Sequence, residues 1–299
     1  MSLSIGFIGC VGSSRIAFET LLALPPEQGR VVGLITRRAS KYNADFIDLT
    51  PLAALHRCPT LYADETPSDQ AQAAWMAEFR PDLIFCVGWS RLLGTKMLST
   101  AHLGTIGFHP AALPANRGRH PLIWALALGL EQTASTFFVM DDSADSGPIA
   151  HQLPLSIAFE DDAATLYAKV LAVIPDQIRH IVAGLADSSL IALEQDHSLA
   201  NHWRKRGPSD GLIDWRMSAR SIYNLVRALT RPYPGADFVH QGQTNKLWRC
   251  EIVSDASANL EPGRVLAVEG RTFIAKCGEG ALRVLDHDMV DLPSAGAYL

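Results

Sequence analysis

Residues 4–24, SIGFIGCVGSSRIAFETLLAL, place a short apolar run directly before a segment whose apolar residues have helical spacing. The run SIGFIG has the length and composition of a buried strand, and a glycine ends it. Three further runs of this kind follow, VVGLIT (31–36), LIFCVG (83–88) and GTIGF (104–108), with helical patterns between them. Strands that alternate with helices predict a Rossmann-like parallel sheet with helices on both faces.

The character of the chain changes after a long helical pattern at residues 159–185, which Pro175 is expected to interrupt. Residues 187–211 have weak periodicity and many turn formers, and therefore predict a linker. One amphipathic helix is expected at 218–230, and short strands with turns fill residues 232–299. The sequence thus predicts an α/β protein with two domains, 1–205 and 206–299, of which the second is a small β-rich barrel.

Composition excludes several classes of protein. With 48% hydrophobic and 19% charged residues in 299, the chain can bury a sizeable core. A net charge of -5 provides no global basic field for nucleic acid or an anionic membrane. No basic leader followed by a long apolar core begins the sequence, so we expect a cytoplasmic protein. Five scattered cysteines without a CxxC pair indicate free thiols, and no metal site is expected.

The turn after the first predicted strand is a candidate anion site. Ser13, Ser14 and Arg15 follow Gly9 and Gly12 there, and backbone N–H groups at a helix start suit a phosphate. The full GxGxxG spacing is absent, and a tight turn with a serine cap explains the same residues.

A histidine and an acidic loop form the second candidate site. His109 ends a predicted strand at the carboxyl edge of the sheet, where open α/β folds bind ligands. Residues 141–147, DDSADSG, end the next predicted strand, and we expect them at the same edge. Asp145 would then reach His109 and form an acid/base pair. A structural histidine and a simple acidic turn are the alternatives.

These residues resemble the N10-formyltetrahydrofolate-dependent formyltransferases, which include methionyl-tRNA and amino-sugar N-formyltransferases. The resemblance lies in HPAALP with His109, in Arg117-Gly118, and in Asp145-Ser146-Gly147. GLIDWRMSARSIYNLVRAL followed by PYPGA also resembles the start of the OB-like C-terminal domain of the tRNA and amino-sugar members.

The resemblance implies a role for each matching residue. His109 would be the catalytic histidine, supported by Asp145. The folate would be held by one segment after the third predicted strand, by one arginine, and by the acidic loop. These residues are Arg91, Leu92, Leu93, Arg119, Asp141, Asp142, Ser143, Ala144 and Asp145.

One position departs from the family. The family has Asn-x-His, in which the asparagine stabilises the oxyanion, whereas this chain has Gly107 two residues before His109. Loss of such a donor lowers the rate of a well-studied hydrolase by roughly 10²–10³. We expect Asn116 to substitute, with His120 as the second candidate.

The implied reaction transfers a formyl group from N10-formyltetrahydrofolate to a primary amine, without a metal. Residues 210–299 hold ten Lys and Arg against eleven Asp and Glu, a net charge of -1 that disfavours tRNA. The loop after the second predicted strand, residues 36–51, lacks the basic, glycine-rich insertion of tRNA formyltransferases. The resemblance therefore favours a nucleotide-linked 4-amino sugar, whose phosphates Ser13, Ser14, Arg15 and Arg117 would contact.

Other readings stay open. Another small amine and methionyl-tRNA are the alternative acceptors. A catalytically weak folate-binding protein and an NADP-dependent oxidoreductase belong to different classes, and Arg37 and Arg38 after the second predicted strand would suit the 2′-phosphate of NADP. The sequence also leaves open whether the chain forms a homodimer.

Overall fold

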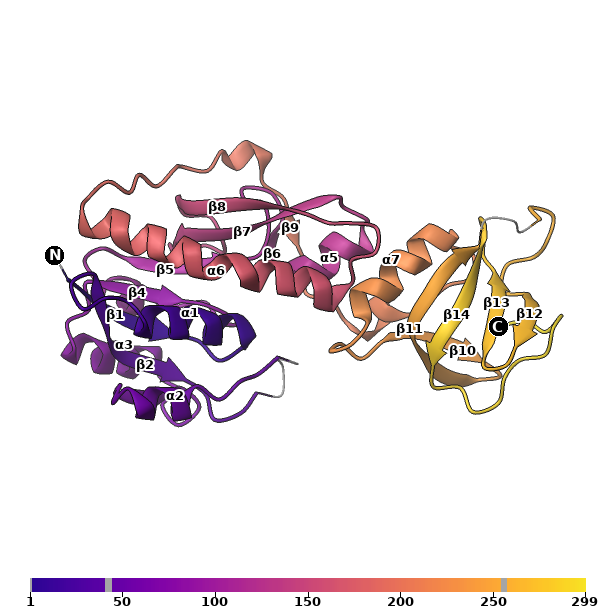
Figure 1. The fold of residues 1–299 in the computed structure, drawn as a ribbon, viewed down its shortest axis with the longest axis horizontal. Helices are drawn as coiled ribbons and strands as arrows, with labels where there is room; N and C mark the ends of the chain where they lie inside the picture. The colour runs from indigo at the N-terminus through magenta and orange to yellow at the C-terminus, as the bar shows by residue number, and fades with distance from the viewer. Residues whose placement is uncertain (1, 41–44, 254–256) are drawn as a thin grey trace. The chain divides into compact units, whose positions relative to one another are not determined.

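A seven-stranded sheet organises the first part of the chain (Figure 1). The computed structural model describes residues 2–40, 45–253 and 257–299, so part of the loop at 36–51 lies outside the described residues. The sheet order is β3-β2-β1-β4-β5-β7-β8. The strands are β1 (Leu3–Ile8), β2 (Gly29–Thr36), β3 (Thr60–Tyr62), β4 (Leu83–Cys86), β5 (Thr105–His109), β7 (Gln132–Val139) and β8 (Ile149–Ser156).

Most of this sheet has the predicted direction. β1 pairs in parallel with β2 and β4, β2 pairs in parallel with β3, and β4 pairs in parallel with β5. β7 is antiparallel to β5, with Ile106 opposite Val139 and His109 opposite Thr136. The α/β fold with a Rossmann-like parallel sheet is therefore confirmed, and an antiparallel strand extends it.

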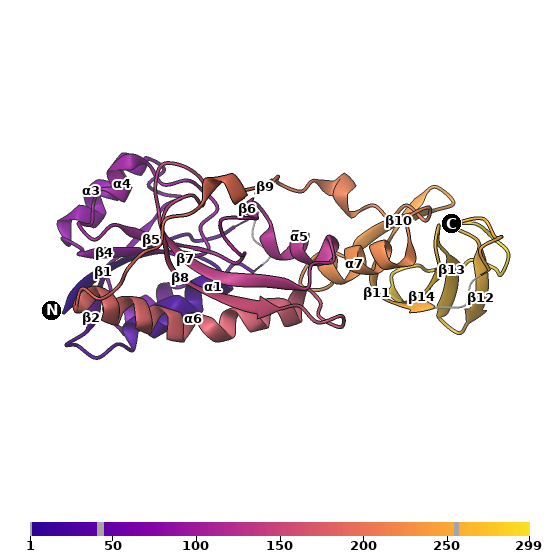
Figure 2. The ribbon, with the colours of Figure 1, turned by 90° about the horizontal axis from the view of Figure 1, so that it is seen from above.

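Helices cover both faces of the sheet (Figure 2). Apolar side chains of α1 (Gly12–Leu22) and α6 (Ala163–Ala186) pack with strand residues in one core cluster. Those of α3 (Asp69–Glu78) and α4 (Thr95–Leu98) pack in a second cluster. The expected break at Pro175 was wrong, because α6 continues through it. Burial of its neighbours Ile174 and Ile178 offsets the hydrogen bond that proline removes.

The described chain groups into two compact units that are not continuous in sequence. The first comprises residues 1–118, 133–155 and 168–203, and the second comprises 119–132, 156–167 and 204–299. The predicted domain limits, 1–205 and 206–299, stay a prediction.

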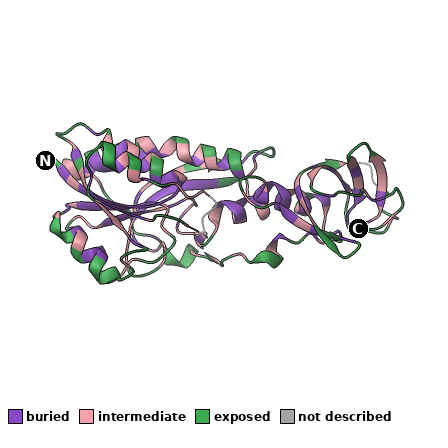
Figure 3. Cartoon of the chain, turned by 90° about the horizontal axis from the view of Figure 1, so that it is seen from below, coloured by how far each residue is buried: buried purple, intermediate pink, exposed green. Residues whose placement is uncertain are grey.

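The second unit contains an antiparallel sheet of five strands, in the order β10-β11-β14-β13-β12. These are β10 (Ala236–His240), β11 (Gln243–Val253), β12 (Val265–Glu269), β13 (Thr272–Lys276) and β14 (Ala281–His287). The helices α5 (Pro121–Ala127) and α7 (Ala219–Leu229) contact each other, and α7 contacts β11. Figure 3 shows helices of the first unit with both buried and exposed residues. In α7, by contrast, eight of eleven residues are buried and only Arg220 is exposed. A β-rich second part is thereby confirmed, while closure into a barrel stays a prediction.

None of the helices in the described residues is long and apolar enough to span a membrane.

Candidate active site

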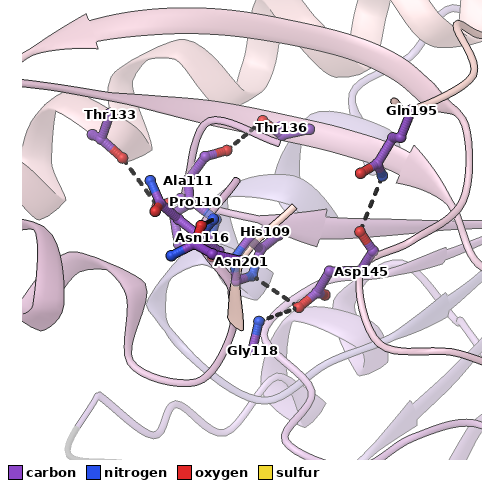
Figure 4. Close-up of polar contacts among 10 residues, drawn as sticks. All are labelled: His109, Pro110, Ala111, Asn116, Gly118, Thr133, Thr136, Asp145, Gln195 and Asn201. Carbon is purple, nitrogen blue, oxygen red and sulfur yellow. Dashed lines mark hydrogen bonds and ion pairs between the residues drawn. The ribbon is translucent and has the colours of Figure 1, made fainter. Parts of the chain in front are cut away.

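His109 is the last residue of β5, and oxygens face both nitrogens of its ring (Figure 4). Its Nε2 lies 2.7 Å from the backbone oxygen of Asn116, and its Nδ1 lies 3.6 Å from Oδ2 of Asp145. A carbonyl oxygen can only accept a hydrogen bond, so Nε2 is the donor in the first contact. A second proton, on Nδ1, would face the carboxylate. The ring is thus held between two acceptors and almost fully buried.

Asp145 lies in the loop between β7 and β8, where its backbone adopts a left-handed conformation with φ of 57°. Its Oδ2 accepts a hydrogen bond of 2.9 Å from the backbone N–H of Gly118. The same oxygen faces His109, so one carboxylate atom links the loop after β7 with β5 and with β6 (Arg117–Gly118). The structure therefore brings together the two residues that the sequence predicted as an acid/base pair.

The predicted reason for this contact was wrong. We expected both residues at a shared carboxyl edge, but β7 is antiparallel to β5, so its last residue, Val139, lies opposite Ile106. The contact arises because the loop at 141–147 and the segment at 116–118 both return to the ring of His109. Tertiary folding of two loops, rather than strand order, makes the pair.

Residues 193–203, called the strap here, contact both loops. The sequence suggested a plain linker at 187–211, and that prediction was wrong for the strap. Leu193 exchanges backbone hydrogen bonds of 2.8 and 2.9 Å with Ile149, just beyond the acidic loop. Asn201 accepts from the N–H of Asn116 at 2.6 Å through its side chain. Its own backbone oxygen accepts from Arg117 at 3.1 Å, and β9 (His202–Trp203) pairs with β6.

Gln195 is the buried polar side chain of the strap. Its Nε2 donates to the backbone oxygens of Asp145 at 3.0 Å and Gly147 at 2.6 Å, and its Oε1 accepts from Nη2 of Arg117 at 2.6 Å. Periodicity offered no signal for Gln195 or Asn201, since a polar residue in an irregular stretch reads as a loop on the surface. Their contacts are with residues distant in sequence, and of the two only Gln195 is buried.

In the first turn the N-cap residue of α1 is Val11 rather than the serine that the alternative expected, and the Ser14 hydroxyl is fully bonded. The Ser14 hydroxyl donates to the oxygen of Val87 at 2.6 Å and accepts from the N–H groups of Cys10 and Val11, each at 3.0 Å. One donor and two lone pairs are all that a hydroxyl has, so Ser14 has no capacity left for a phosphate. Ser13 is buried, and Arg15 is exposed and paired with Glu19. A phosphate contact from these two residues stays a prediction.

A comparison with protein families and a comparison with solved structures identify the relatives of this chain. Residues 20–178 match the formyl transferase family, and residues 206–290 match the C-terminal domain of formyl transferases. The chain belongs to the formyl transferase family.

Solved structures share the fold of this formyl transferase at low sequence identity. HypX from Aquifex aeolicus, in complex with tetrahydrofolic acid, is 16% identical with a TM-score of 0.67, over 95% of this chain and 44% of HypX. The chain thus spans less than half of HypX. WlaRD, a sugar 3N-formyl transferase studied with dTDP and 5-N-formyl-THF, is 14% identical with a TM-score of 0.70, over 95% of this chain and 97% of WlaRD.

A third structure is the N-formyltransferase from Helicobacter canadensis in complex with folinic acid and dTDP-3-aminofucose. It is 13% identical with a TM-score of 0.71, over 95% of this chain and 99% of its own.

Apart from Arg119, the residues that the family resemblance assigns to folate lie on two loops of the first unit. Arg91 and Leu92 are exposed after β4, while Leu93 packs against the second core cluster. In the acidic loop, Asp141 accepts from the N–H of Ser143 at 3.0 Å and from the hydroxyl of Ser146 at 2.7 Å. Asp142 and Ser143 are exposed, and Ala144 is half-buried. Folate contacts from these residues stay predictions.

Arg119 and His120 of this formyl transferase belong to the second unit. Burial lowers the pKa of His120, and the nearby positive charges of Arg119, Arg206 and Lys205 lower it further. The predicted folate contact of Arg119 and the donor role of His120 stay predictions.

The space beside Gly107 is filled. A Cβ atom there would lie 2.7 Å from Cγ of Met140 and 2.9 Å from Cζ of Phe138. Asn116, the predicted substitute donor, has a φ of 63°, with its N–H bonded to Asn201 and its oxygen to His109. Its backbone is fixed at two points beside the ring, and its side-chain role stays a prediction.

Arg117 is buried and bonded to the strap. Its Nη2 donates to Gln195 and, at 3.1 Å, to Nδ1 of His197, while its buried Nε has no partner among the described residues. Through these contacts the Arg117 guanidinium stabilises the fold of the site. Its predicted contact with an acceptor phosphate stays a prediction. No three His, Cys, Asp or Glu side chains group as a metal site in the described parts of the chain.

Proposed function

We propose that this formyl transferase moves the formyl group of N10-formyltetrahydrofolate onto the primary amine of a nucleotide-linked 4-amino sugar. The observation that carries the proposal is the buried His109–Asp145 pair at 3.6 Å. A carboxylate that faces an imidazole nitrogen orients the ring and supports a proton on it, as general acid/base chemistry requires.

In the proposed reaction, the amine nitrogen attacks the formyl carbon and a new C–N bond forms. The carbonyl π electrons move to oxygen and return as the bond from carbon to N10 breaks. The amine loses one proton, and Asp145 is its final acceptor. N10 gains one proton from His109. Nε2 of His109 is bonded to Asn116, so it must exchange that oxygen for the substrate. The side-chain N–H₂ of Asn116, which takes no part in that backbone contact, would meet the oxyanion.

Three observations support a small acceptor. The net charge of -1 over residues 210–299 offers no basic surface for the phosphates of tRNA. WlaRD and the Helicobacter canadensis enzyme match this chain over nearly their whole lengths, and both are described with a dTDP ligand. A 4-N formyltransferase from Francisella tularensis also matches, at 17% identity over 81% of this chain and with a TM-score of 0.66. Ser13 and Arg15 remain the proposed contacts for the acceptor's phosphates.

The test supplies the purified protein with N10-formyltetrahydrofolate and a panel of amines. The panel contains nucleotide-linked 4-amino and 3-amino sugars, free amino sugars and methionyl-tRNA, and mass spectrometry detects the gain of one CO unit. Formylation of a 4-amino sugar nucleotide with the highest kcat/KM supports the proposal. Preference for a 3-amino sugar or for methionyl-tRNA would refute the acceptor, and absorbance titrations that detect NADPH binding but no folate binding would refute the donor.

A further inference from the structure

We propose that Gln195 is a positioning residue that holds the turn at Asp145–Gly147, so that the Asp145 carboxylate faces His109. Its importance for turnover rests on the proposed function, whereas its effect on the turn does not. The strap therefore acts on the reaction through Asp145, without touching the reacting atoms.

The bonds of Gln195 account for every polar atom of its amide. Its NH₂ group has two protons, and these meet the carbonyl oxygens of Asp145 at 3.0 Å and Gly147 at 2.6 Å, on either side of Ser146. The residue is 6% exposed, so water does not replace these bonds when they are lost. One side chain thus fixes a turn whose first residue has a left-handed backbone.

Arg117 sets which way the amide faces. A guanidinium can only donate, so the atom 2.6 Å from its Nη2 must be the amide oxygen. A flipped amide would place its oxygen against two carbonyl oxygens and its NH₂ group against the cation. Arg117 is itself 4% exposed, and a charged donor strengthens the bond.

These contacts close into a ring of bonds. Arg117 bonds Gln195, Gln195 bonds the backbone of Asp145, and the Asp145 carboxylate accepts from the N–H of Gly118, which follows Arg117 in the chain. The side chain and the main chain of Asp145 are therefore both anchored to β6. Moving the carboxylate away from His109 requires at least one of these buried bonds to break.

The loss of Gln195 removes the main-chain anchor and leaves only the bond from Gly118. The contact with His109 is already 3.6 Å long, so little further displacement separates the pair. Misplacement of a catalytic group by about 1 Å lowers a rate by roughly 10²-fold. We therefore expect a lower kcat although the catalytic side chains are intact.

The deciding variant is Gln195→Glu, which keeps the shape and the contact with Arg117 but replaces both donors with an acceptor. Gln177→Glu is the matched control. Gln177 is 0% exposed, donates to the oxygen of Ser135 at 2.9 Å and accepts from its hydroxyl at 2.6 Å. Its side chain bonds to Ser135 on β7 and to His151 on β8, not to the acidic loop.

Both variants are measured by thermal unfolding, by hydrogen exchange of the peptide that covers residues 141–148, and by steady-state kinetics. We expect Gln195→Glu to lower kcat by roughly 10- to 100-fold with an unchanged acceptor KM, and to speed exchange in that peptide about tenfold. Gln177→Glu should lower the unfolding temperature with neither effect. A purely structural role predicts equal kcat losses in the two variants.

Unchanged exchange and unchanged kcat in Gln195→Glu would overturn the proposal, as would equal effects in the control. Gln195→Met, which removes all three bonds without adding a charge, replaces the first variant if that protein does not fold. If the wild type formylates no acceptor, the proposed function fails, and the exchange of residues 141–148 still decides whether Gln195 holds the turn.

Discussion

The pairing of His109 with Asp145 predicts a large energetic coupling between them. Nδ1 and Oδ2 are 3.6 Å apart, and the two side chains are only 6% and 18% exposed. At an effective dielectric constant of about 20, opposite unit charges at that distance attract by about 4.6 kcal/mol. Desolvation and the bond to Gly118 offset part of this, so we expect a coupling of roughly 2–3 kcal/mol, or about 30- to 150-fold in rate.

The perturbations are His109→Ala, Asp145→Asn and the double variant. Asn keeps an oxygen that can accept from Gly118, so the second change removes the charge with little disturbance of the turn. Each single change should lower kcat by roughly 10²-fold, at the lower end of the usual contribution of general acid/base catalysis. The double variant should lose little more than the worse single variant, because residues that act as a unit are not additive.

The assay measures single-turnover formylation of the preferred acceptor by mass spectrometry with saturating formyl donor. Calorimetric titration with the donor and thermal unfolding show whether each variant still binds and folds. A double variant whose loss equals the product of the two single losses would refute the coupling. Near-normal turnover in His109→Ala would refute the catalytic role of the pair altogether.

Four further outcomes follow from particular contacts. Gly107→Asn should lower the unfolding temperature because its Cβ meets Met140 at 2.7 Å, and Met140→Ala in the same protein should restore part of the loss. Asn116→Ala should lower kcat by roughly 10²-fold or more with unchanged donor affinity, if its amide meets the oxyanion. Burial raises the pKa of the Cys58 thiol from 9.0 to about 11, so alkylation by iodoacetamide at neutral pH should be roughly 100-fold slower than for the unfolded chain. The folded-state pKa of His120 lies below its unfolded value of 6.5, so the unfolded state binds more protons as the pH drops below 6.5. The free energy of unfolding should therefore fall as the pH drops through that range. Denaturant titrations of His120→Gln should show a weaker dependence on pH.

Much of the sheet could be predicted because its central strands are buried on both faces and therefore apolar throughout. β4, with four buried residues, is such a strand. β3 has only three residues, and β8 contains Pro154 and has only one buried residue, Ala150. Both lie at the ends of the sheet, where half-burial removes the signal that identified the central strands.

The residues of the site also fall into those that the sequence predicted and those that it missed. His109 and Asp145 could be predicted because charged and titratable residues beside prolines and glycines stand out from an apolar background. Gln195 and Asn201 could not, because nothing in an irregular stretch shows that a polar side chain bonds to a loop distant in sequence. Their place depends on pairing with Ile149 and with β6. Pairing between segments this far apart in sequence is set by the tertiary structure, and local sequence patterns do not reveal it.

The absence of the family's asparagine at position 107 also has an explanation that only the folded structure provides. Met140 and Phe138 occupy the room that any side chain at 107 would need, so the residue is glycine for a packing reason. A donor for the oxyanion must then come from outside β5. Asn116 is held beside His109 by its carbonyl oxygen and by the strap through Asn201, which fixes its backbone and leaves its side chain to rotate. Under the proposed function, the strap would position both the proposed base, Asp145, through Gln195 and the proposed donor, Asn116, through Asn201. Turnover with glycine at position 107 would then depend all the more on that segment.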